Sequence, residues 1–153
     1  MISIDSNLLL YGLASNMAEH RAARAFLEGL VARENVAISE FVLVELYRLL
    51  RLPALHAHPL SAAKATAVIQ QYRCHPRWRI VGFPEGGSPA LHDELWRMAS
   101  WADFAYRRIF DARLALTLRQ HHVTEFATAN VKDFQGFGFT RVWNPLASGV
   151  TGR

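Results

Sequence analysis

The chain has 153 residues, of which 51% are hydrophobic and 20% charged, and a formal net charge of +4. This size predicts one globular domain, over residues 1–147, that folds without a disulfide or a metal. The single Cys74 excludes an internal disulfide, and we expect it to be a small buried hydrophobe. No stretch approaches the ~18 apolar residues of a membrane helix, so we expect a cytoplasmic protein without a membrane partner. The basic charge favours an acidic partner, either nucleic acid or an acidic protein.

The first apolar run, Ile2 to Ile4, predicts a buried strand that delivers Asp5 to its carboxyl end, followed by Ser6 and Asn7. Open α/β sheets place their ligands at this edge. Asp5 is therefore the first candidate for a functional residue.

Strands and helices alternate along the rest of the chain. Ser39 is expected to cap a helix that Pro53 ends. The pattern predicts helices over residues 17–33, 41–52, 61–72, about 90–101 and about 104–120, and further strands over 36–38, 79–82, 124–128 and 141–143. We expect a three-layer α/β/α sandwich around a mostly parallel sheet of four or five strands, with residues 148–153 as a flexible tail.

Glu45 is a second acid among apolar neighbours, in the segment Val44-Glu45-Leu46. Arg48 is the one charged residue on the same helical face, so an exposed ion pair is the simple alternative to a functional role.

Asp111 lies near the start of a helix that is otherwise apolar and basic. The structural alternative is a favourable place in the helix dipole with an ion pair to Arg107 or Arg108. The small Ala112 and Ala115 would let this helix lie close to the sheet, which would bring Asp111 towards the end of the first strand.

Asp133 and Asn130 follow the fourth predicted strand. Asn130 could cap a helix, with Asp133 completing a capping box, or Asp133 could turn its carboxylate inward from a loop where catalytic groups are commonly displayed.

These acids can converge, because the first and fourth strands would be neighbours at the switch point of a doubly wound sheet. Two carboxylates ~4 Å apart repel by ~4 kcal/mol at an effective dielectric constant of ~20, so such a group needs a cation. Oxygen ligands alone favour Mg²⁺ or Mn²⁺ over zinc.

The motifs together resemble the PIN-domain ribonucleases, and within them the VapC-type toxins of bacterial toxin–antitoxin pairs. The matching segments are Ile4-Asp5-Ser6-Asn7-Leu8-Leu9-Leu10-Tyr11, Val44-Glu45-Leu46, Phe110-Asp111-Ala112-Arg113-Leu114-Ala115 and Thr128-Ala129-Asn130-Val131-Lys132-Asp133-Phe134. The resemblance covers nearly the whole chain. It implies a PIN-like fold and a Mg²⁺- or Mn²⁺-dependent endoribonuclease, usually a homodimer, that a small VapB-type antitoxin neutralises by covering the active site.

The sequence departs from this family at one position. Where many relatives have a fourth acid two residues after the Thr, this chain has Asn130, so either Asp133 or the Asn130 amide oxygen would complete the site.

The hypothesis for the mechanism is that Asp5, Glu45 and Asp111, with Asp133 or Asn130, hold one or two divalent ions that bind the scissile phosphate of RNA and activate a water. Asp5 and Asp111 are expected to be direct ligands, and Glu45 a ligand or a base acting through water. Candidates for substrate binding are Ser6, Asn130, Arg107, Arg108 and Arg113.

Two other functions fit parts of the sequence. A haloacid-dehalogenase-like phosphatase also has an Asp at the end of its first strand, but it needs a second Asp where this chain has Asn7. A non-catalytic module that binds RNA or protein would need no metal. The aromatic residues Trp96, Trp101, Phe104 and Tyr106 could stack bases, form a dimer contact or fill the core, and core packing is the favoured interpretation.

Overall fold

The computed structural model describes residues 1–82 and 89–147, and within them five short strands form a parallel sheet. These are β1 (Ile2–Ile4), β2 (Ala37–Ser39), β3 (Arg79–Val81), β4 (Glu125–Ala127) and β5 (Arg141–Trp143). β4 lies between β1 and β5, and β2 pairs with β3. An isolated parallel bridge between Ile2 and Val36 joins the two groups, which gives the order β3, β2, β1, β4, β5.

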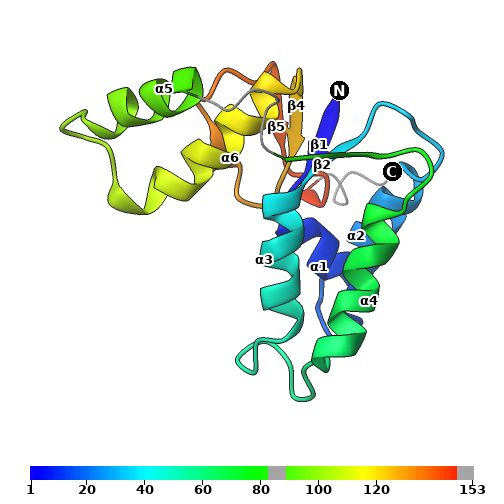
Figure 1. The fold of residues 1–153 in the computed structure, drawn as a ribbon. Helices are drawn as coiled ribbons and strands as arrows, with labels where there is room; N and C mark the ends of the chain where they lie inside the picture. The colour runs from blue at the N-terminus through cyan, green and yellow to red at the C-terminus, as the bar shows by residue number, and fades with distance from the viewer. Residues whose placement is uncertain (83–88, 148–153) are drawn as a thin grey trace.

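Helices flank this sheet on opposite sides. They are α1 (Ser6–Leu13), α2 (His20–Glu28), α3 (Glu40–Leu50), α4 (Ala62–Arg73), α5 (Pro89–Ala99), α6 (Ile109–Gln120) and α7 (Val131–Phe134), with a 3₁₀ turn η1 (Tyr106–Arg108) before α6. In Figure 1, α1 and α3 start where the strands end and extend below them with α2 and α4, whereas α5 and α6 lie to the left of the strands. The predicted α/β/α architecture with parallel strands is confirmed.

The core forms where strands and helices meet at the centre of the molecule. Ile4 of β1 and Phe126 of β4 are fully buried, as expected for parallel strands covered on both faces. Ala112 and Ala115 of α6 are fully buried as well. Their small side chains let α6 pack closely, which confirms the role expected of them.

Three helices differ from the prediction. α1 was not predicted, because Leu8, Leu9 and Leu10 form an apolar run with no helical period; all three are buried, and a short run of this kind fits a strand or a helix equally well. α2 is shorter than the predicted 17–33. Turns closed by hydrogen bonds between residues three apart, His20 N to Met17 O at 3.1 Å and Arg33 N to Leu30 O at 2.9 Å, replace its ends. α6 starts at Ile109, after the η1 turn, and not at about residue 104.

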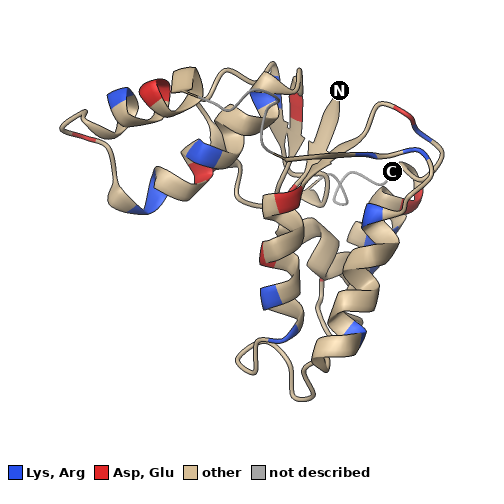
Figure 2. Cartoon of the chain, in the orientation of Figure 1, with Lys and Arg blue, Asp and Glu red and all other residues tan. Residues whose placement is uncertain are grey.

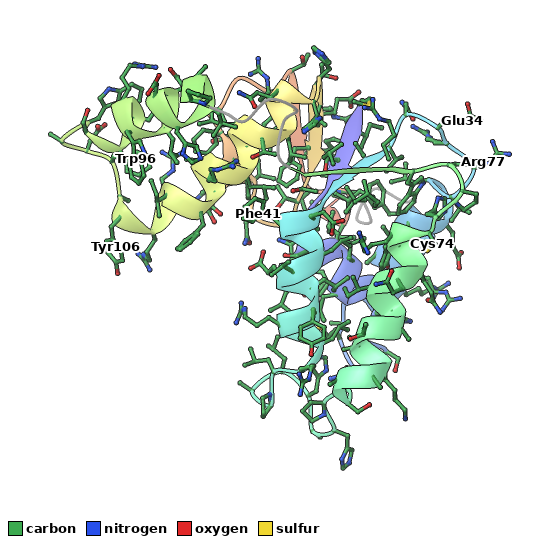
Figure 3. All side chains as sticks on the ribbon, viewed as in Figure 1. Glu34, Phe41, Cys74, Arg77, Trp96 and Tyr106 are labelled. Carbon is green, nitrogen blue, oxygen red and sulfur yellow. The ribbon has the colours of Figure 1, made fainter. Side chains whose placement is uncertain are left out.

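Several side chains expected inside the protein lie on its surface. Cys74 follows the end of α4 and is exposed, so the prediction of a buried thiol was wrong. Trp96, Trp101 and Tyr106 are exposed too, which contradicts the preference for core packing, whereas Phe104 is partly buried against the core as expected. Figure 3 labels Cys74, Trp96 and Tyr106. The expected tail, residues 148–153, lies outside the described residues. Among the described helices, none has the length and apolar character needed to cross a membrane.

Candidate active site

Asp5 is the most firmly held acid of the site. It follows β1, and only 5% of its surface is exposed. Its Oδ1 accepts hydrogen bonds from the Ser6 backbone N–H at 2.7 Å and, more weakly, from the Ser6 hydroxyl at 3.3 Å. Its Oδ2 accepts from the Thr128 hydroxyl at 2.6 Å and from the Asn7 amide at 2.9 Å. Both oxygens are satisfied, so the carboxylate is fixed in one orientation at the start of α1.

Thr128 is a site residue that the sequence analysis did not select. It is fully buried directly after β4, and its Oγ1 also accepts from the Asn130 backbone N–H at 2.9 Å. β1 and β4 pair in parallel with Ile4 opposite Ala127, so the residues that follow, Asp5 and Thr128, meet at the same edge. The sequence analysis predicted that the first and fourth strands are neighbours, and that prediction could have identified Thr128.

Glu45 lies on α3 and contacts the Asp5 region through Ser6. The Ser6 hydroxyl donates to Glu45 Oε2 at 2.9 Å, while Arg48 Nη2 lies 3.8 Å from Glu45 Oε1. Both interpretations of Glu45 are therefore realised: it forms the partly exposed ion pair on α3, and it belongs to the same polar cluster as Asp5.

Asp111 lies in the first turn of α6, where the helix dipole favours an acid. Its carboxylate is partly buried. Among the described residues it makes no hydrogen bond or ion pair through its side chain, so the alternative of a pair with Arg107 or Arg108 is not realised.

The capping box suggested for Asn130 and Asp133 is absent from the described residues. Asn130 is the N-cap residue of α7, but its side chain makes no capping hydrogen bond. The Asn130 N–H donates to Thr128, and the Asp133 backbone N–H donates to the Asn130 carbonyl at 3.1 Å. Asn130 lines the cleft with Asp5, whereas Asp133 is exposed and does not line it.

The three arginines near Asp111 have different environments. Arg107 and Arg113 line the cleft. Arg108 does not; its guanidinium donates to the carbonyl of Gln135 at 3.2 Å and lies 4.9 Å from the centre of the Phe137 ring. Arg108 therefore anchors the segment after α7. In Figure 2 the acidic positions of α3 lie above its basic ones, whereas basic positions lie on both sides of the acidic one at the start of α6.

Most of the polar residues described above line one open cleft of about 840 Å³ between α1, α3 and α6. It is lined by Asp5, Ser6, Glu45, Arg107, Asp111, Arg113 and Asn130, together with apolar side chains such as Leu10, Phe41, Val44 and Phe110. Acids from three separate elements thus face a common space.

Burial and mutual repulsion raise the pKa of two of these acids. Burial raises the pKa of Asp5 to about 6, the Thr128 hydrogen bond opposes this, and the negative Glu45 adds to it. Burial also raises the pKa of Asp111 to about 6; the negative Asp133 and Glu45 add to this, and the positive charge of Arg108 opposes it. Glu45 therefore acts on both acids, and negative charge accumulates in the cleft.

The carboxylate and amide oxygens of the cleft form a donor set that suits a hard divalent cation. Among the described residues, however, no three His, Cys, Asp or Glu side chains already form a metal-binding group. Asp5 is fixed, so Glu45 and Asp111, which are less constrained, would have to turn towards it.

Comparisons with known proteins agree with the fold. Residues 2–138 match the family model of the PIN domain. The chain is 47% identical over 148 residues to Ribonuclease VapC24 of Mycobacterium tuberculosis, strains CDC 1551 / Oshkosh and ATCC 25618 / H37Rv, covering 97% of this chain and 99% of that protein. The chain belongs to the PIN-domain family, in the group of the VapC ribonucleases.

Solved structures share the fold at low sequence identity. VapC20 of Mycobacterium tuberculosis, described as a toxin that cleaves the sarcin-ricin loop, matches with a TM-score of 0.65 at 18% identity, over 91% of this chain and 96% of that one. FitAcB of Neisseria gonorrhoeae matches with a TM-score of 0.62 at 23% identity, over 95% and 98%. A toxin–antitoxin complex from Klebsiella pneumoniae matches with a TM-score of 0.56 at 21% identity, over 95% and 98%.

Proposed function

We propose that the chain is the toxin of a VapBC-type toxin–antitoxin pair, an endoribonuclease that hydrolyses RNA phosphodiester bonds in the cytoplasm with Mg²⁺ or Mn²⁺. The observation that carries this proposal is the placement of Asp5, Glu45 and Asp111 in one cleft. The chain is also 47% identical to a ribonuclease over nearly its whole length.

Asp5 and Asp111 would ligate the cation directly, and Glu45 would act as a ligand or as a base through water. Asn130, which lines the cleft, and Asp133, whose negative charge raises the pKa of Asp111, are the two candidates for the fourth position. When bound, the cation would polarise the scissile phosphate and lower the pKa of the attacking water.

The chain's own side chains would position the RNA around these acids. Arg107 and Arg113 line the cleft beside Asp111 and would bind phosphates. The Ser6 hydroxyl, which now donates to Glu45, would donate to a phosphate oxygen when Glu45 turns to the cation. In-line displacement would leave a 5′-phosphate and a 3′-hydroxyl.

Two protein partners belong to the proposal. A small VapB-type antitoxin would cover the cleft, in keeping with the toxin–antitoxin complex from Klebsiella pneumoniae that shares this fold. The exposed Trp96 and Trp101, at and beyond the end of α5, would favour association with a second copy of the chain, which sedimentation of the purified protein would detect.

Cleavage by the purified chain tests the proposed reaction. We expect cleavage of RNA with Mg²⁺ or Mn²⁺, none with EDTA, and 5′-phosphate ends on the products. Asp5→Asn should lose this cleavage and weaken the Mn²⁺ binding isotherm, whereas the exposed Asp93→Asn on α5 should keep both. Metal-independent cleavage, or full activity in Asp5→Asn, would contradict the proposal.

A further inference from the structure

Two phenylalanine rings lie exposed in the cleft beside the acids. Phe110 directly precedes Asp111, and 82% of its surface is exposed. Phe41 is 42% exposed and lies four residues before Glu45, hence on the same face of α3. In Figure 3, Phe41 is at the upper end of α3, on the side of α6. An aromatic and an acid thus occur together on each of the two facing helices.

Guanidinium groups accompany these rings. The Arg113 guanidinium lies 5.4 Å from the centre of the Phe41 ring, and Arg107 lines the cleft near Phe110. The cleft therefore offers flat apolar surfaces, positive charge and carboxylates at once. A ligand that stacks on the rings and pairs with the guanidinium groups has flat bases and phosphates, and both must be accessible.

We infer that Phe110, with Phe41, stacks on the bases beside the scissile phosphate. This inference rests on the proposed function and adds a residue that contacts the bases of the substrate. In a duplex, each base face is covered by its neighbours, and a phenyl ring cannot reach it. In an unpaired segment, each base can stack on an aromatic side chain.

The arrangement favours RNA over a protein as the occupant of Phe110. A purely apolar protein contact would leave the carboxylates and arginines of the same cleft desolvated and unmatched. A polynucleotide supplies phosphates for the arginines next to bases for the rings. The chain's net charge of +4 has the sign that attracts it.

Binding of short RNA to Phe110 variants tests the inference. The probe is a fluorescein-labelled oligoribonucleotide, single-stranded or annealed as a blunt duplex, and each variant is made in an Asp5→Asn background so that the RNA stays intact. We expect Phe110→Ala and Phe110→Leu to weaken single-strand binding about tenfold and Phe110→Trp to retain it. Phe110→Leu keeps an apolar side chain, so a loss of RNA affinity in this variant would identify stacking and not simple apolar burial.

Two controls make the result specific. Trp96→Ala removes another aromatic side chain, 60% exposed on α5 and outside the cleft, and should bind RNA as the parent does. A 2-aminopurine base placed in the single strand should lose fluorescence on binding the parent, and lose less with Phe110→Ala. Duplex RNA should bind more weakly and respond little to Phe110.

Equal single-strand affinity in Phe110→Ala and the parent would overturn the inference, while metal-dependent cleavage by the wild-type chain would still support the proposed function. Sedimentation changed by Phe110→Ala with RNA affinity unchanged would assign the ring to a protein interface, which also overturns it. Absence of any metal-dependent RNA cleavage by the wild-type chain would instead contradict the proposed function itself.

Discussion

The two walls of the cleft hold their acids in opposite ways. On the sheet side, Asp5 is buried at the end of β1, and both of its carboxylate oxygens accept hydrogen bonds, among them the 2.6 Å bond from Thr128. On the helix side, Asp111 projects from the first turn of α6 and has no such bond among the described residues. The pKa of each is nevertheless raised to about 6.

The similar pKa values of Asp5 and Asp111 thus have different physical causes. At Asp5, strong desolvation is partly offset by hydrogen bonds that stabilise the charged form. At Asp111, weaker desolvation combines with repulsion from Asp133 and Glu45. The difference indicates one acid that is preorganised and one that can adjust, which suits the proposed cation site.

The largest effect is expected from removing the charge at Asp111. Asp111→Asn should lower metal-dependent RNA cleavage by more than about a hundredfold. Removing a direct metal ligand should slow cleavage more than removing a residue that only orients a ligand. Its thermal midpoint should stay unchanged, since the carboxylate makes no structural hydrogen bond. Cleavage rates and thermal melts, beside Asp93→Asn, measure this, and activity near that of the control would remove Asp111 from the site.

The pH dependence of stability comes next. Because the pKa values of Asp5 and Asp111 are raised from 3.8 to about 6 on folding, their contribution to the free energy of unfolding is complete below about 3.8 and is lost as the pH rises through about 6. For Asp5 this amounts to at most about 3 kcal/mol, and the more exposed Asp111 adds less.

Urea denaturation in EDTA across this pH range measures the effect. Mg²⁺ or Mn²⁺ should recover stability above about 6, because the cation binds the ionised acids of the folded state. Asp5→Asn should flatten the profile. A metal-free stability that is constant through this range would show that Asp5 ionises without cost.

Lengthening each acid by one methylene compares the two walls directly. Asp5→Glu overfills an enclosed position and should cost about 1–3 kcal/mol of stability. Asp111→Glu has open space in the cleft and should cost less than about 0.5 kcal/mol. Equal losses in urea denaturation would mean that Asp111 is as constrained as Asp5.

A smaller loss of stability than the upper range for Asp5→Glu is expected from changing the residue that holds Asp5. Thr128→Val should cost about 1–2 kcal/mol, because Asp5 Oδ2 and the Asn130 N–H both lose a partner. Loss of the hydroxyl should raise the pKa of Asp5 further and move the acidic limb of the pH–activity profile upwards. Thr128→Ser should restore both properties; if it does not, the methyl group and not the hydroxyl is the important part.

Much of the fold was predictable because its pattern is local. The apolar runs of β1 and β4 and the Ser39 cap before α3 can each be identified from a few adjacent residues. α1 was missed, because its leucines carry no period that separates helix from strand. Cys74 and Trp96 were placed wrongly, since exposure depends on what lies opposite a residue and not on its own hydrophobicity.

The candidate acids were selected from sequence because a carboxylate among apolar neighbours is costly unless it has a function. The sequence did not indicate the relative roles of these acids, and it did not lead to the selection of Thr128. Asp5 and Thr128 are 123 positions apart, yet their side chains meet at 2.6 Å once β1 and β4 pair.

The sequence alone determined the family, the alternation of strands and helices and the acids themselves, because each of these is a matter of residue type and short spacing. Only the tertiary structure decided that Asn130 and not Asp133 lines the cleft, that Arg108 anchors a loop, and that Phe110 stands exposed beside Asp111. The physical reason is that burial, hydrogen bonding and pKa depend on distances between segments, and the packing of the sheet and helices sets those distances.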